Sequence, residues 1–100
     1  MRPSKYILVD GEPCPAELME WARWFETADR TVARTERDGV TVSTVFLSID
    51  HNFSPKGPSI LWETMVFGGP LDGEEQRYTS AEAAKHGHEQ MVALAMGQGR

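Results

Sequence analysis

The spacing of apolar residues changes abruptly near position 30 of this chain, and few folds accommodate such a change. Before it, apolar side chains recur every three to four residues, as on one face of a helix. After it, they alternate over residues 31–37 and 40–49, which flank Asp38-Gly39. Both positions of such a turn need positive φ angles, which Gly takes freely and Asp tolerates. The sequence predicts a helix followed directly by a β-hairpin, with Arg37 paired to Val40.

The segments around this hairpin follow the same two periods. Residues 6–9 form a short β-branched and aromatic run that predicts a strand. A helix is expected over 16–29, with Pro15 close to its first turn. Its apolar face comprises Leu18, Trp21, Ala22, Phe25 and Ala28. Residues 60–67 predict a third strand of the hairpin's sheet, and the polar residues 75–78 predict a short edge strand.

A second amphipathic helix ends the chain. Thr79-Ser80-Ala81-Glu82 fits a capping box in which the Thr79 hydroxyl would accept from the third amide. The helix's apolar face contains Ala81, Ala84, His88, Met91, Val92 and Ala95. We expect residues 97–100 to be frayed.

These elements predict one α+β domain over residues 1–100, a length typical of a single domain. Its order is β-α-β-β-β-β-α, an antiparallel meander of about four to five strands with both helices packed on one face. The other sheet face would then be partly bare. Such a face meets solvent or a partner, and it could support a homodimer.

Charge and composition exclude several classes of protein. The net charge is −5 and no basic stripe occurs, so direct nucleic-acid binding is not expected. No apolar run approaches the length of a membrane span or of a signal-peptide core, so we expect a cytoplasmic protein. Cys14 is the only cysteine, which excludes an internal disulfide. The residues Asp72, Glu74 and Glu75 form a small acidic concentration that we consider as an interaction site.

Asp50-His51-Asn52-Phe53 is the most informative polar cluster. It follows a strand that is apolar on both sides and therefore predicted to be interior. In a catalytic interpretation, His51 is a general base oriented by Asp50. In the alternative interpretation, Asp50 and Asn52 bond nearby amides in a turn. The second is favoured, because no nucleophile motif accompanies the cluster.

The remaining histidines, His86 and His88, are weak candidates for a metal or catalytic site. His86 and His88 are two residues apart on a predicted helix, so they face different sides and cannot share a metal ion. His88 falls on the apolar face, which favours a buried structural histidine. No metal or cofactor motif occurs in the sequence. A small enzyme or metal site remains an alternative if His51 and His88 come together in the fold.

Aromatic residues suggest a surface for a partner. Most of the large aromatic rings are expected in the core. Trp24 is offset from the apolar face shared by Trp21 and Phe25, so it is the ring that we expect at the surface if one is exposed. An exposed Trp is typical of interface anchors. Phe53, in the predicted loop, is the second aromatic candidate.

Four segments of the chain together have the appearance of a known family: LMEWARWFETADRTVA (18–33), VSTVFLSIDHNF (42–53), ETMVFGGPLDGE (63–74) and RYTSAEAAKHGHEQMV (77–92). In this order they resemble small uncharacterised proteins of tailed bacteriophages and prophages. The usual form of that family has Phe in place of Trp62 and Trp in place of Ala81, so the last helix begins differently here. The resemblance implies a phage origin and transfers no functional residue.

Three functions stay open at this point. The leading hypothesis is a phage accessory protein that binds a host or phage protein, for example in host takeover or anti-defence, without catalysis. The second is the small enzyme or metal-binding protein with a site near His51 and His88. The third is a minor virion or morphogenesis component.

Overall fold

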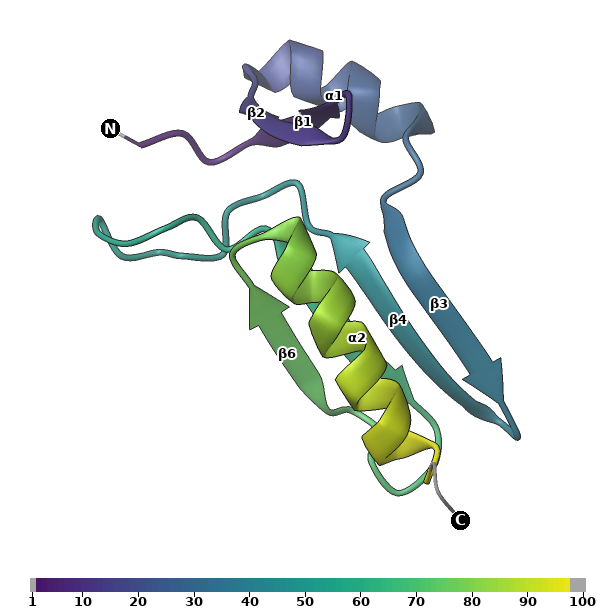
Figure 1. Cartoon of the computed structure of the whole chain (residues 1–100). Coiled ribbons are helices and arrows are strands. Elements are labelled where there is room, and N and C mark those ends of the chain that lie inside the picture. Colours follow the sequence, from purple (N-terminus) through teal and green to yellow (C-terminus); the bar gives the residue numbers. More distant parts are fainter. Residues whose placement is uncertain (1, 98–100) are drawn as a thin grey trace.

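A four-stranded antiparallel meander forms the centre of the computed structural model, which describes residues 2–97 (Figure 1). Its strands lie in sequence order: β3 (Thr31–Arg37), β4 (Val40–Phe46), β5 (Trp62–Phe67) and β6 (Glu75–Tyr78). The turn between β3 and β4 has φ angles of 53° at Asp38 and 80° at Gly39. The predicted hairpin and its pairing of Arg37 with Val40 are confirmed.

Helix α2 (Ala81–Ala95) covers one face of this sheet (Figure 1). Every second residue of β4 and β5 points toward it and is buried: Val42, Thr44, Phe46, Trp62, Thr64 and Val66. The helix contributes Ala84, Gly87, His88 and Met91. Its N-cap differs from the expected one. Ser80, not Thr79, accepts a hydrogen bond from the amide of Ala83 at 3.1 Å, because the helix begins one residue later than the capping box requires.

An N-terminal unit lies beyond one end of the meander (Figure 1). It contains β1 (Tyr6–Val9), β2 (Glu12–Pro15) and α1 (Leu18–Thr27), and β1 pairs antiparallel with β2. Strand β2 is not expected from its sequence, since two of its four residues are proline. Both prolines are tolerated because β2 is an edge strand. Pro15 therefore ends this strand and does not enter the helix.

The N-terminal unit is joined to the meander through the chain that follows β4. The carbonyl of Ser48 accepts from the amide of Tyr6 at 2.9 Å and from Nε1 of Trp21 at 3.2 Å. Lys5 pairs with Ile49 beside it. Ser48 is buried and adopts a left-handed φ of 66°, which bends the chain out of the sheet.

The α+β class and the element order are confirmed, with β2 added between β1 and α1. The structure differs in the placement of α1. Only α2 lies on the sheet, whereas α1 packs on β1 and reaches the apolar layer through Trp24. Helix α1 lies away from the sheet because hydrogen bonds to the carbonyl of Ser48 fix the N-terminal unit at the end of the sheet. No helix within residues 2–97 is long and apolar enough to cross a membrane. Of the expected frayed end, residues 98–100 lie outside the described part.

Candidate functional site

Asp50 lies where the chain leaves the end of β4 and enters the loop 51–60. The residue is only 4% exposed. Its Oδ1 accepts hydrogen bonds from the amides of Asn52 at 2.8 Å and Ile60 at 2.9 Å. Its Oδ2 lies 3.2 Å from Nη2 of Arg2. Both carboxylate oxygens are therefore engaged by the loop and by the N-terminal segment.

The electrostatics of Asp50 are those of a structural carboxylate. Burial by itself would raise the pKa of the carboxyl. The two loop amides, the hydroxyl of Ser59 and the guanidinium of Arg2 act in the opposite direction and hold that pKa below its ordinary value. A carboxylate of lowered pKa whose oxygens already have partners is a poor proton acceptor near neutral pH.

His51 is fixed by a backbone group and not by Asp50. Its Nδ1 lies 2.8 Å from the carbonyl oxygen of Ile49. Since a carbonyl oxygen only accepts, Nδ1 carries the proton and Nε2 is the unprotonated nitrogen of the neutral ring. The geometry thus does not contain the predicted arrangement of a histidine oriented by the neighbouring carboxylate.

The loop itself is held by a set of polar contacts. The side-chain amide of Asn52 donates to the carbonyls of Lys56 at 3.0 Å and Pro58 at 2.8 Å. Its Oδ1 accepts from the amide of Ser54 at 3.0 Å. Arg2 reaches across and donates to the carbonyl of Ser54 at 3.3 Å. The turn-forming interpretation of Asp50 and Asn52 describes these contacts, and the long-range partner Arg2 is an addition to it.

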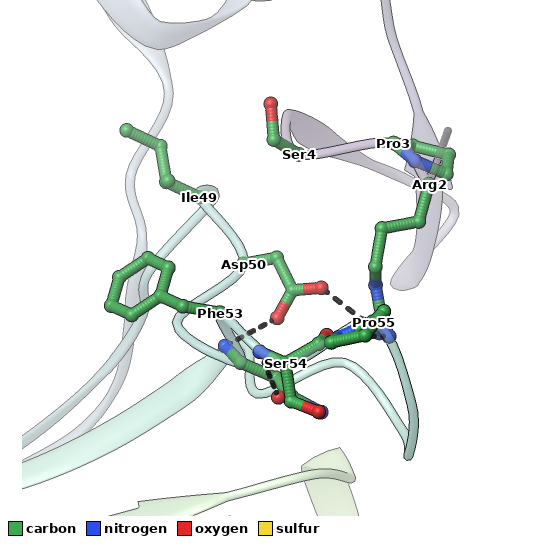
Figure 2. Close-up of a pocket in the computed structure, with 9 residues that line it drawn as sticks. Arg2, Pro3, Ser4, Ile49, Asp50, Phe53, Ser54 and Pro55 are labelled. Atoms are coloured by element: carbon green, nitrogen blue, oxygen red, sulfur yellow. Dashed lines mark hydrogen bonds and ion pairs between the residues drawn. The ribbon is translucent and has the colours of Figure 1, made fainter.

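Phe53 is the exception in this well-bonded loop. It is 84% exposed, and the nearby Ile49 is 38% exposed. Figure 2 shows both side chains on the side of the loop away from the ion pair of Asp50 and Arg2. A pocket of about 430 Å³ lies beside them, and its lining also includes Pro3, Pro55 and the ion pair of Arg2 with Asp50. An exposed aromatic ring next to a mostly apolar depression is the arrangement found at protein-binding surfaces.

A second polar cluster lies between α2 and the sheet, around His88. Nδ1 of His88 is 2.8 Å from Oγ1 of Thr44, and Nε2 is 2.9 Å from Oγ1 of Thr35. Thr44 is hydrogen-bonded in turn to Thr64 at 2.5 Å, and Thr64 accepts from the hydroxyl of Tyr78 at 3.0 Å. Five side chains from four strands and one helix thus form one continuous chain of hydrogen bonds.

Both ring nitrogens of His88 have a hydroxyl partner in this chain of bonds. In the neutral ring one nitrogen donates and the other accepts, so His88 donates to one of Thr44 and Thr35 and accepts from the other. Burial lowers the pKa of His88, and the nearby Glu89 opposes this shift only in part.

The structure keeps the two candidate histidines apart. His51 contacts Ile49 and Phe53, whereas His88 contacts threonines of the sheet, and they share no partner among residues 2–97. His86 is exposed on another side of α2, as its spacing from His88 predicted. In the described part of the chain, no group of three or more His, Cys, Asp or Glu side chains is arranged to hold a metal ion.

Trp24 is not the exposed tryptophan that the sequence suggested. It is partly buried and packs edge-on against Phe46, with ring centroids 5.9 Å apart. Phe25 is the more exposed ring of α1, at 38%, and it stacks on Trp21. The difference arises because α1 lies at the end of the sheet with Trp24 against Phe46 and Trp21 bonded to the carbonyl of Ser48.

The acidic candidates are all exposed but have different surroundings. Oδ1 of Asp72 accepts from the amide of Gly68 at 2.7 Å and so closes the loop after β5. Glu75 pairs with Arg77 at 3.1 Å. Glu74 has no hydrogen bond or ion pair through its side chain within residues 2–97. Of the three carboxylates, Asp72 and Glu75 therefore have partners within the chain.

Several important residues were not selected from the sequence. Arg2 contacts Asp50 across 48 positions, and no local pattern reveals such a pair. Thr44 and Thr64 could have been found from the sequence. Each is a polar residue in a series of alternate residues that is otherwise apolar and buried. Two such interruptions in neighbouring strands, with a histidine on the helix expected above them, indicate a buried hydrogen-bond network.

Comparison with protein-family models, with curated proteins and with solved structures finds no significant match for this chain.

Proposed function

We propose that the protein is a small phage or prophage accessory protein that acts in the host cytoplasm by binding another protein, without catalysing a reaction. The phage origin rests on the resemblance of four segments that together span most of residues 18–92. The mode of action rests on one observation, which is the exposure of Phe53 on a loop fixed by hydrogen bonds.

The energetics of Phe53 support this role. Burying a phenylalanine side chain is favourable by about 1.5–3 kcal/mol. A flexible loop would lose much of this gain in ordering on association. Here Asp50 and Asn52 already bond the loop's own amides and carbonyls, so little further ordering is needed. The neighbouring pocket offers a recess for one side chain of the partner.

The polar residues of the region argue for binding over catalysis. Both oxygens of Asp50 have partners, and Nδ1 of His51 is bonded to the backbone. Both ring nitrogens of His88 are bonded inside the molecule. Only His51 among them has a free proton-accepting atom, Nε2, and no serine, cysteine or carboxylate of residues 2–97 is hydrogen-bonded to it.

Affinity capture with matched variants tests the proposal. The wild-type protein, Phe53→Ser and Lys56→Ala are immobilised and exposed to lysates of host and infected cells. Lys56 is the control because it is exposed on the same loop and its side chain makes no hydrogen bond or ion pair within residues 2–97. We expect a captured protein that is retained by Lys56→Ala and bound at least about tenfold more weakly by Phe53→Ser.

Capture of the same proteins in the same amounts by all three forms would contradict the role of Phe53. Mass spectrometry of purified phage particles tests the accessory assignment separately. Stoichiometric presence in the particle would replace it with the virion component. Absence from particles, together with Phe53-dependent capture, is the outcome that we expect.

A further inference from the structure

The meander has a second face, on the side opposite α2, that no helix of residues 2–97 covers. We call it the open face. It is formed by the side chains of β3–β6 that alternate with the buried ones. The open face contains apolar side chains, of which Phe67 is 50% exposed. It also contains charged side chains from both edge strands.

The strand register arranges these side chains in rows across the sheet. The middle row is Arg34, Ser43, Met65 and Glu75, because these residues are paired in order from β3 to β6. Its two ends therefore have opposite charges. They are separated by three strand spacings, or about 14 Å, so Arg34 and Glu75 cannot pair with each other within one chain.

Within the chain, each of these charges has only an exposed partner on its own strand. Arg34 lies 3.2 Å from Glu36, and Glu75 lies 3.1 Å from Arg77. The four side chains are between 43% and 57% exposed. Such surface pairs contribute little, which leaves Arg34 and Glu75 available for stronger pairing with another molecule.

We propose that the open face binds a second copy of this chain about a two-fold axis parallel to the strands. This axis reverses the strand order across the interface. It places Arg34 of one protomer opposite Glu75 of the partner subunit, and the symmetry repeats the contact at the other edge. A two-fold axis across the strands would instead bring Arg34 toward its own copy, and like charges there would repel.

The rest of the open face fits the same arrangement. Ser43 and Met65 occupy the middle of the row, and the uncharged Val45 and Phe67 lie in the neighbouring rows of β4 and β5. Glu63, the one acidic residue on these two strands, is 15% exposed and is neutralised by Arg77 at 3.0 Å. Uncharged residues at the centre and charges at the rim are the usual anatomy of a protein interface. Two twisted sheets pack face to face at about 10 Å, so their side chains interdigitate.

Charge reversal at both ends of the row tests this proposal. Dimerisation of the full chain is measured by sedimentation equilibrium over a concentration series. We expect Arg34→Glu and Glu75→Arg each to raise the dimer Kd by about tenfold or more. The double variant should return the Kd to near the wild-type value, because it restores opposite charges across the interface.

Two controls separate dimerisation from folding. Arg34→Glu creates repulsion with Glu36, and Glu75→Arg creates repulsion with Arg77. The double variant contains both of these repulsions within the chain. If its dimer Kd nevertheless returns to the wild-type value, the cause is the restored contact between protomers. Arg23→Glu makes the same charge change on the exposed side of α1 and should leave the Kd unchanged. Thermal denaturation of each variant shows that it is folded.

Several results would overturn the proposal. One is a wild-type protein that stays monomeric up to about 1 mM, a concentration at which even a weak dimer forms. Another is a dimer that tolerates both single reversals or that the double variant does not recover. A captured foreign protein that depends on Arg34 and Glu75, in place of self-association, would also exclude a second copy as the occupant.

Discussion

His88 is the residue whose chemical state depends most on the fold. It is 5% exposed and both ring nitrogens are hydrogen-bonded. A second proton would make both ring nitrogens donors, so the hydroxyls of Thr44 and Thr35 would both have to accept from the ring. Burial disfavours the charged ring and therefore favours the neutral form.

This preference predicts a pH dependence of stability. The pKa of His88 is lowered in the folded state, so the unfolded chain, with an ordinary value near 6.5, binds more protons once the pH falls below about 6.5. The free energy of unfolding should fall as pH decreases from about 6.5 to the folded pKa and should be independent of this group at higher pH. Urea denaturation between about pH 5 and 8 measures it.

His88→Asn and His86→Asn are the matched variants for this experiment. His88→Asn should lose about 1–3 kcal/mol at neutral pH, because the bond to Thr35 is broken, and should show a smaller slope with pH. His86 is exposed on the same helix, so its substitution should leave the slope unchanged. An equal slope in the wild type and His88→Asn would show that His88 does not cause the dependence.

Among the elements, α2 shows how a helix accepts a residue with poor helical propensity. Gly87 lies in its middle, where glycine is less favourable than alanine by about 1 kcal/mol. The reason is the strand layer beneath it. A Cβ atom at Gly87 would overlap the ring and hydroxyl of Tyr78. The close approach that a mid-helix glycine suggests is present, and it brings the helix down onto β6.

The expected result of Gly87→Ala therefore depends on Tyr78. In the wild-type background, the substitution should cost about 1–3 kcal/mol of stability through overpacking, despite the better propensity of alanine. In a Tyr78→Ala background, the same change should cost nothing or stabilise the helix. Urea denaturation of the four proteins gives the coupling free energy. Equal costs in both backgrounds would exclude the contact as the reason for the glycine.

At the scale of the whole molecule, the N-terminal unit extends the shape. The radius of gyration is 14.7 Å, above the value of about 13 Å for a compact chain of this length. The extents are 47 × 30 × 21 Å. The unit and the segment before it are connected to the rest by bonds to the backbone of Ser48 and by the ion pair of Arg2 with Asp50. Tyr6, Leu8 and Trp24 also pack on the apolar cluster that contains Phe46. These contacts determine whether the two parts unfold together.

We expect the wild-type protein to unfold in one transition, since Trp24 belongs to the same apolar cluster as Phe46, Trp62 and Ala84. Trp24→Ala should cost about 2–3 kcal/mol, because the ring is partly buried, and should separate the N-terminal unit from the rest. Calorimetry then gives a van't Hoff enthalpy below the calorimetric one. Phe25→Ala, at a more exposed ring of the same helix, should keep the single transition. Two transitions in the wild type would contradict this coupling.

The open face and the Phe53 loop are both properties of the whole molecule. The sequence predicted a partly bare sheet face, because both helices were expected to pack on the same side of the meander. It also predicted a loop at Phe53. It did not reveal that Arg2 would fix this loop, since the contact joins residues far apart in the chain.

Local patterns alone determined the strands of the meander and the register of its hairpin. Asp38-Gly39 specifies that register, whereas β4 is apolar on both sides, so alternation did not specify which of its faces points inward. The tertiary structure alone decided where α1 lies, that Trp24 is partly buried, and that Asp50 bonds Arg2 instead of His51. The physical reason is that the spacing of apolar residues can identify which face of a helix or strand is buried, but not which surface of the molecule covers that face. Which surfaces and polar groups meet depends on how the whole chain packs.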